Sequence, residues 1–308
     1  MKTISQLKLM MSLVLICFTT GLMAQDQTDQ ELSQKLYQEY QENGIDKALD
    51  MYNKSSAKGN EYTGMSEPLN ILAYRIMMDS HDMEAAKKAF KAQIEEYPDK
   101  ANPMDSYADL LIEEGDKEQA KEYLKKSVAL AENSDNEQEN TEVYRASKAK
   151  LAHLENKDRK LDFLIGTWNT DLTSYQDGKE TNKSTGYTTS TDYDEDNGMM
   201  NVVIKDPSGN PVAKRIVVYD ALDDAYDMAY IDPTQPLGIR TSTIKVKDMG
   251  DNKYEFMENY TTRDGKEKTA RHELKKNEDG NLEWVIYDKS EDGSDWEKVA
   301  VYDYKKSM

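Results

Sequence analysis

The sequence is poor in the residues that most often carry chemistry. Its 308 residues include one cysteine, Cys17, and three histidines, His81, His153 and His272, each in a different segment. Because Cys17 lies in an N-terminal segment that we expect to be removed, the rest of the chain has no disulfide, no thiol nucleophile and no cysteine metal ligand. Histidines this far apart supply neither a catalytic triad nor a zinc site readily.

Known catalytic and cofactor motifs are missing as well. The sequence has no Gly-x-Ser-x-Gly elbow, no His-Glu-x-x-His, no Walker loop and no dinucleotide-binding glycine pattern. Asp192, Asp194 and Asp196 alternate as in a calcium-binding loop. The glycine, however, comes one place late at Gly198, and Val203 stands where the closing glutamate is required. We therefore predict no catalytic residue, no bound metal and no cofactor.

Positive charge is scarce relative to negative charge. The chain has 40 lysines and arginines against 59 aspartates and glutamates, which gives a formal net charge of −19 and a pI near 4.7. Such an excess repels nucleic-acid phosphates and disfavours binding to anionic lipid. We predict no nucleic-acid partner and interpret the charge as a source of solubility.

The N-terminal segment has the layout of a secretory signal. Two lysines precede an apolar run over residues 9–16, and small residues follow up to Ala24. The run is shorter than the roughly 20 residues that a spanning helix needs, so we predict a signal peptide over residues 1–24, cleaved near Ala24. An uncleaved anchor and lipidation of Cys17 are the alternatives. The prediction places the mature protein, without a membrane span, in the periplasm or outside the cell.

The first half of the chain repeats itself. Two stretches match at a distance of 34 positions, so that Ala86 corresponds to Ala120 and Phe90 to Leu124. A weaker third copy lies around residues 44–52. Small alanines permit close approach of two helices, and the larger residue four positions later fills the space beside them on the same face. The pattern predicts helical hairpins with a period of 34 residues.

This repeat resembles the tetratricopeptide repeat over residues 29–132. It departs from that family where His81 replaces the usual turn glycine and where no tryptophan opens a repeat. With a capping helix after the last repeat, the helical solenoid domain is predicted to cover residues 25–156. The resemblance implies a concave groove that binds a peptide or protein partner, the alternative being ordinary solvated helix surface. The residues that match the groove positions are Arg75, Met78, Asp79, Asn102, Asp105, Asp109 and Ile112.

After residue 166 the pattern changes to alternating residues separated by turn dipeptides. Asp177-Gly178, Ser208-Gly209 and Asp279-Gly280 are typical of tight hairpin turns. About ten strand-like runs follow one another without a convincing helix between them, which excludes parallel strand-helix-strand units. An antiparallel sheet of this size removes its edges by closing. We predict an all-β, up-and-down barrel domain over residues 157–308.

A Gly-x-Trp, Gly166 and Trp168, stands at the start of the first strand after a short apolar turn. With the strand meander, it resembles the lipocalin or calycin architecture and bacterial lipocalin-like domains that begin in the same way. The resemblance implies that Trp168 packs across the closed end of the barrel. A haem ligand at His272 is an alternative, but the surrounding stretch is strongly polar and no glycine-rich continuation follows the tryptophan. The aromatic residues predicted to line a cavity, or to fill the core instead, are Tyr187, Tyr230, Tyr254, Phe256, Trp284 and Tyr287.

These patterns favour an exported, non-enzymatic binding protein of two domains. The helical array would bind a peptide or protein partner, and the barrel would hold a small apolar ligand. Two alternatives stay open. One is a secreted enzyme that uses a carboxylate such as Asp171 or Glu273 in a barrel cavity, and the other is a structural adaptor that binds only proteins.

Overall fold

A computed structural model describes residues 23–55, 57–59, 62, 64, 67–195, 198–232, 239–262, 265–290 and 293–307. Nearly all of the predicted signal segment, residues 1–22, therefore lies outside the described residues. The chain divides into two compact units, Met1–Glu155 and Asn156–Met308. No helix in the described part of the chain is both long enough and apolar enough to cross a membrane.

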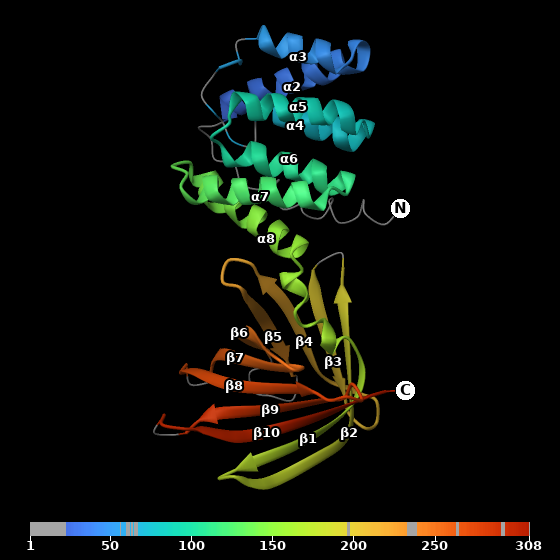
Figure 1. The fold of residues 1–308 in the computed structure, drawn as a ribbon, viewed down its shortest axis with the longest axis vertical. Coiled ribbons are helices and arrows are strands. Elements are labelled where there is room, and N and C mark those ends of the chain that lie inside the picture. The colour runs from blue at the N-terminus through green and yellow to red at the C-terminus, as the bar shows by residue number, and fades with distance from the viewer. Residues whose placement is uncertain are drawn as a thin grey trace. The chain divides into compact units, whose positions relative to one another are not determined.

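The first unit is built from helices that pack against their neighbours in the chain (Figure 1). Pro68 begins one of them at a position where its missing N–H costs nothing. Asp82 and Asp116 cap two others, accepting hydrogen bonds from the backbone N–H groups of Ala85 and Gln119. The elements are α2 Met23–Asn43, α3 Ile45–Asn53, α4 Pro68–Arg75, η2 Ile76–Ser80, α5 Met83–Glu96, α6 Ala101–Glu114, α7 Lys117–Glu132, η3 Glu139–Val143 and α8 Tyr144–Leu154.

The helical turns repeat with the spacing seen in the sequence. His81, before α5, and Gly115, before α7, stand 34 positions apart, and both adopt the left-handed conformation, with φ of 54° and 83°. The small and large residues that define the repeat all have exposed fractions of 1% or less: Ala48, Tyr52, Ala86, Phe90, Ala120 and Leu124. The repeated apolar positions thus form the core between paired helices.

The second unit is a closed antiparallel barrel, as the turn pattern predicts. Each strand pairs with its neighbours in the chain, and β1 closes the sheet by pairing with β10. Asp177 and Gly178 both have positive φ, 50° and 71°, which suits the two-residue hairpin between β1 and β2. The strands are β1 Gly166–Gln176, β2 Lys179–Asp194, β3 Met199–Lys205, β4 Pro211–Asp220, β5 Ala225–Ile231, β6 Ile239–Gly250, β7 Lys253–Thr261, β8 Glu267–Lys276, β9 Leu282–Lys289 and β10 Trp296–Lys306.

One end of the barrel is closed by the turns that precede β1. These are η4 Lys157–Arg159 and η5 Asp162–Leu164. Phe163 stacks on Tyr254 with ring centroids 4.3 Å apart. Trp168 is 4% exposed, and its Nε1–H donates to the carbonyl oxygen of Leu164 at 2.9 Å. Gly166 has a φ of 135°, a backbone conformation that favours glycine, so the chain can change direction there into the first strand.

Candidate ligand site in the barrel

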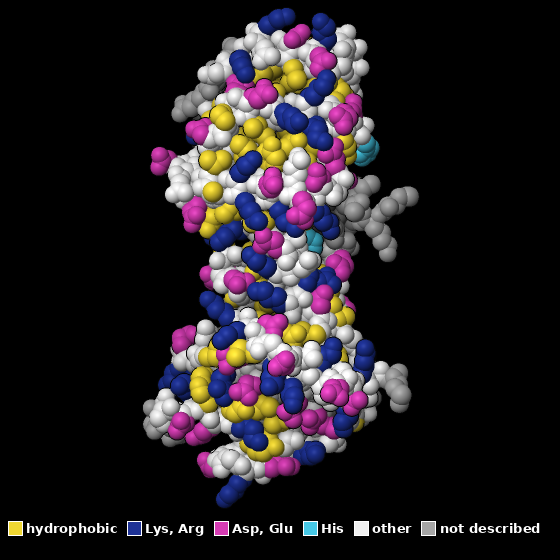
Figure 2. Space-filling model, viewed as in Figure 1, with side chains coloured by type: hydrophobic (Ala, Val, Ile, Leu, Met, Phe, Trp, Pro, Cys, Tyr) yellow, Lys and Arg dark blue, Asp and Glu magenta, His cyan; other side chains and the backbone are white. Residues whose placement is uncertain are grey.

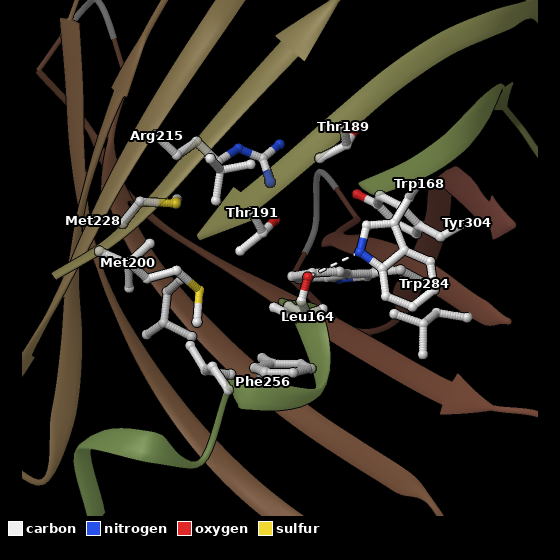
Figure 3. A pocket seen from close by; sticks show the side chains of 15 residues that line it. Leu164, Trp168, Thr189, Thr191, Met200, Arg215, Met228, Phe256, Trp284 and Tyr304 are labelled. Carbon is white, nitrogen blue, oxygen red and sulfur yellow. Dashed lines mark hydrogen bonds between the residues drawn. The ribbon is translucent and has the colours of Figure 1, made fainter. Parts of the chain in front are cut away.

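A cavity of about 50 Å³ lies inside the barrel next to its closed end (Figure 3). Because side chains alternate between the two faces of each strand, one set of residues from most of the strands meets in the lumen. The residues that line the cavity are Leu161, Leu164, Trp168, Thr189, Thr191, Met200, Val202, Arg215, Val217, Met228, Ile244, Phe256, Leu282, Trp284 and Tyr304. Most of this lining is apolar, and one residue carries a full charge.

Two of the six predicted aromatic residues line this cavity, Phe256 and Trp284. Their rings stack with centroids 5.1 Å apart. Tyr254 lies at the closed end, where it stacks on Phe163. The cavity therefore brings together only part of the aromatic set that the sequence indicated.

The other three predicted residues lie elsewhere on the barrel. Tyr187 pairs with the buried Thr170 and shares its inner face, farther from the closed end. Tyr230 lies between two guanidinium groups, with Arg215 5.3 Å and Arg240 5.2 Å from its ring centroid. Tyr287 alternates with the inward residues of β9 and lies on the outer face, where its hydroxyl donates to Glu273.

Arg215 is the one charged residue of this lining, and it was not predicted from the sequence. It lies on β4 between the buried Ala213 and Val217, which occupy the same face of the strand. The alternation in AKRIVVYD therefore places a guanidinium among inward apolar residues. An arginine on the apolar face of an amphipathic strand is the signal that could have identified it.

Arg215 has no paired carboxylate. Its Nε atom is buried and has no hydrogen-bond partner among the described residues, and no described carboxylate lies within 4.0 Å of its guanidinium. Burial lowers the pKa of Arg215, but the phenols of Tyr304, Tyr302 and Tyr230 and the more distant Glu258 raise it, and the net shift is upward. Burial raises the pKa of the neighbouring Tyr304 to about 12, and the Arg215 cation acts in the opposite direction. Tyr304 is consequently a neutral phenol at physiological pH, so it offers dipolar but not ionic compensation.

Three neighbouring side chains, Trp284, His272 and Glu258, lie beside the cavity. Trp284 donates its Nε1–H to Nδ1 of His272 at 3.0 Å. Nδ1 is therefore the acceptor, and the ring proton resides on Nε2. Nε2 lies 3.0 Å from Oε2 of Glu258, a close contact without hydrogen-bond geometry. The hydrogen bond to the histidine thus fixes the orientation of Trp284 against the cavity.

Glu258 is an anion inside the barrel, although it forms no ion pair with Arg215. Burial raises its pKa, whereas the neighbouring His272 and the more distant charge of Arg215 lower it, and the net shift is downward. The carboxylate therefore stays ionised at neutral pH. Its nearest compensation comes from His272, so the guanidinium faces the cavity without a carboxylate of its own.

No family model and no curated protein matches the sequence.

The carboxylates that the enzyme hypothesis requires lie outside the lumen. Asp171 alternates with the inward Thr170 and accepts a hydrogen bond from the backbone N–H of Gly186 at 3.2 Å. Glu273 alternates with the inward His272 and pairs with Arg271 at 3.1 Å. Among the residues with described positions, no group of three or more His, Cys, Asp or Glu side chains could hold a metal ion.

In the helical unit, the predicted groove residues fall into two sets. The first set lies on α4 and η2, where the Arg75 guanidinium stacks 4.2 Å from the ring centroid of Tyr37. Asp79 is exposed, and Met78 is partly buried against the core. On the face drawn in Figure 2, side chains of both charges are interspersed with hydrophobic ones over the helices.

The second set lies on α6 and is covered by other helices. Asn102, Asp105 and Asp109 are 3%, 7% and 9% exposed, and Ile112 packs against the core. Lys150 of α8 extends its ammonium group between the two aspartates, 2.8 Å from Oδ2 of Asp105. These three polar residues therefore line no open surface, because the helix that follows the repeats occupies that position.

The aspartates of α6 form a compact charge cluster with α8. Ser147 donates to Asp105 at 2.6 Å, and Tyr74 donates to Asp109 at 2.7 Å. Burial alone lowers the pKa of Lys150, but the charges of the two aspartates raise it above its usual value. The lysine is thus a cation with two anionic partners, each of which accepts a further hydrogen bond. These contacts stabilise the packing of α8 against α6.

Proposed function

We propose that this protein is an exported, non-enzymatic binding protein whose lipocalin-like barrel holds a small ligand with an apolar body. The observation that supports the proposal is the cavity of about 50 Å³, lined by Met200, Met228, Phe256 and Trp284. Small-molecule sites have this character: concave, largely apolar and supplied with a few polar groups. The volume corresponds to about two ordered water molecules at roughly 30 Å³ each, so the bound form accommodates a very small molecule or the small end of a longer one.

The proposed ligand role is tested by native mass spectrometry of the protein purified from its own source. We expect a co-purifying small molecule, released on denaturation. Val217→Phe, which places a ring in the cavity, should abolish it. Val218→Phe is the matched control, because Val218 is the next residue of β4 and is 39% exposed on the outer face. A bare polypeptide mass for the wild type over several preparations contradicts the proposal.

Catalysis by the barrel has less support than binding. Asp171 and Glu273 lie outside the lumen, and the inward His272 uses Nδ1 to accept from Trp284 while its Nε2 lies 3.0 Å from Oε2 of Glu258. A general base needs a free nitrogen or carboxylate within reach of a substrate proton. The arrangement supports an orienting role for His272.

We also propose that the tetratricopeptide-like array binds a peptide or protein partner through the exposed side of α4 and η2. Support comes from Arg75, held over Tyr37, beside the exposed Asp79. Arginine and tyrosine are enriched where proteins bind one another. Cross-linking in cell-envelope extracts should give a defined adduct that Arg75→Ala removes. Lys47→Ala, at another exposed helix position, serves as the control, and equal adducts from both variants contradict this surface.

A further inference from the structure

We propose that the barrel cavity takes a short-chain carboxylate, with its head group on Arg215 and its hydrocarbon part against Met228, Phe256 and Trp284. This inference rests on the proposed function of the lumen as a ligand site and names the chemical class of the ligand. Four observations carry it: a cation without a paired carboxylate, an anion that lies beside a histidine, an apolar wall and the size of the space.

Arg215 is a charged, partly buried side chain in a mostly apolar cavity. A cation withdrawn from water without a counter-ion is unfavourable, and proteins usually pair it or leave it in water. Arg215 meets no carboxylate within ion-pair distance among the described residues, and its buried Nε is left with an unused proton. A carboxylate in the cavity would supply both the missing charge and the missing hydrogen-bond acceptor, because a guanidinium matches a carboxylate in two-point geometry.

Glu258 is the carboxylate of the lumen that could otherwise pair with Arg215. Its Oε2 lies 3.0 Å from Nε2 of His272, which is itself held by Trp284. The carboxylate on β7 thus has a close partner in His272 and is not within ion-pair distance of the guanidinium on β4. The lumen therefore contains an anion beside a histidine and a cation without a paired carboxylate.

The side chains around the proposed head group are partly polar and partly apolar. Figure 3 shows the Arg215 guanidinium pointing into the cavity, with Thr191 and Thr189 projecting from the neighbouring wall and Met228 and Phe256 among the residues around the same space. No hydrogen bond of the Thr191 hydroxyl is formed within the described part of the chain, so it can donate to a carboxylate oxygen. A strongly hydrated inorganic anion would lose its water against apolar walls. A carboxylate with an apolar tail fits both kinds of surface.

The cavity is small. A volume of about 50 Å³ has space for about two ordered waters at roughly 30 Å³ each, which matches a carboxylate with very few carbon atoms. We therefore expect acetate to bind in the cavity as it stands and propionate and butyrate to bind when the flexible Met200 and Met228 side chains move aside, whereas long fatty acids would require the barrel to widen.

Tryptophan is a suitable reporter for this proposal. The chain has three tryptophans, and two of them, Trp168 and Trp284, line the cavity. Trp296 lies on the outer face of β10, with Lys289 4.6 Å from its ring centroid. In ¹⁹F NMR of the full chain labelled with 5-fluorotryptophan, butyrate should move the Trp168 and Trp284 signals saturably. The Trp296 signal should stay in place and serves as the internal control.

The variants separate charge from shape. Arg215→Met should weaken butyrate binding at least about tenfold, the smallest loss expected for a charge-assisted hydrogen bond. Arg240→Met is the matched control, because Arg240 flanks the same face of the barrel at Tyr230 but is exposed. Arg215→Lys keeps the charge and loses the two-point geometry, so it should bind with intermediate affinity, and it keeps the test usable if Arg215→Met fails to fold.

The outcomes distinguish this inference from the proposed function. If 1-butanol moves the two cavity signals as strongly as butyrate and Arg215→Met has no effect, the assignment of the ligand as a carboxylate is wrong, but the proposed ligand site is not contradicted. If chloride at equal ionic strength saturates the same shift, the apolar tail is irrelevant and the inference is overturned. If neither butyrate nor butanol moves any signal, both the inference and the ligand site fail.

Discussion

Each half of this protein contains a cation among buried side chains, and the two cations differ in whether carboxylates pair with them. In the helical unit, Lys150 has two aspartate partners, and all three side chains are between 10% and 13% exposed. In the barrel, Arg215 has no carboxylate within ion-pair distance among the described residues. A cation with two paired carboxylates is explained by its contribution to the fold. A cation without a paired carboxylate calls for another explanation, and the ligand that we propose would supply it.

The strongest test of this contrast is the replacement of Lys150 by methionine. The change leaves Asp105 and Asp109 buried without their cation, and breaking such a cluster from one side typically costs about 3–5 kcal/mol. Denaturant unfolding followed by far-UV circular dichroism reports the helices. Lys125→Met is the control, because Lys125 is 60% exposed in its pair with Glu155 and should change stability by less than about 0.5 kcal/mol. Equal effects from both would show that the cluster contributes little.

Lys150→Met should also change the pH dependence of stability. Burial raises the pKa of Asp109 while Lys150 lowers it, so the variant raises that pKa further. A carboxyl whose folded pKa exceeds its unfolded value binds more protons in the folded state, and stability then increases as pH falls through the folded pKa. The destabilisation should therefore shrink between pH 7 and about 4, near the unfolded pKa of aspartate. A cost independent of pH would point to lost packing instead.

The same substitution at the other cation should have the opposite sign. Arg215→Met removes a charge that has no paired carboxylate and leaves a side chain that suits the apolar wall, so the ligand-free barrel should keep its stability or gain about 1 kcal/mol. Tryptophan fluorescence isolates this effect, because Trp168, Trp284 and Trp296 all belong to the barrel. A loss of about 3 kcal/mol or more would mean that Glu258 balances Arg215 across the lumen, and the contrast between the two units would disappear.

The sequence predicts these two regions unequally well, for a physical reason. The closed antiparallel barrel follows from local signals, since hairpin turns such as Asp177-Gly178 fix the connection of adjacent strands. The outward orientation of Tyr287 does not follow from the sequence, because the run LEWVIYD is apolar on both sides near its middle. The inward orientation of Arg215 could have been predicted, because Ala213 and Val217 mark the inward face of the same strand.

The helical site was harder to foresee. Asp105 and Asp109 look like an exposed acidic face, because their cation is contributed by a helix some forty residues later in the chain. Periodicity assigns a helix its apolar stripe but says nothing about a polar stripe that another helix covers. The cluster of Glu258, His272 and Trp284 likewise depends on three strands meeting in register.

The smallest predicted effect compares the two helical turns themselves. His81 and Gly115 occupy equivalent left-handed positions, with φ of 54° and 83°, and a side chain with Cβ is strained there whereas glycine is not. His81→Gly should stabilise the helical unit by about 0.5–1 kcal/mol, since the relief of strain exceeds the entropy that glycine adds to the unfolded chain. Gly115→His makes the reciprocal change, and its Cβ would meet nothing within 4 Å, so it should destabilise by a similar amount through backbone strain alone. Far-UV circular dichroism in denaturant measures both. A destabilised His81→Gly would mean that the imidazole makes a contribution of its own at this turn, and the two repeats would then differ in more than their strain.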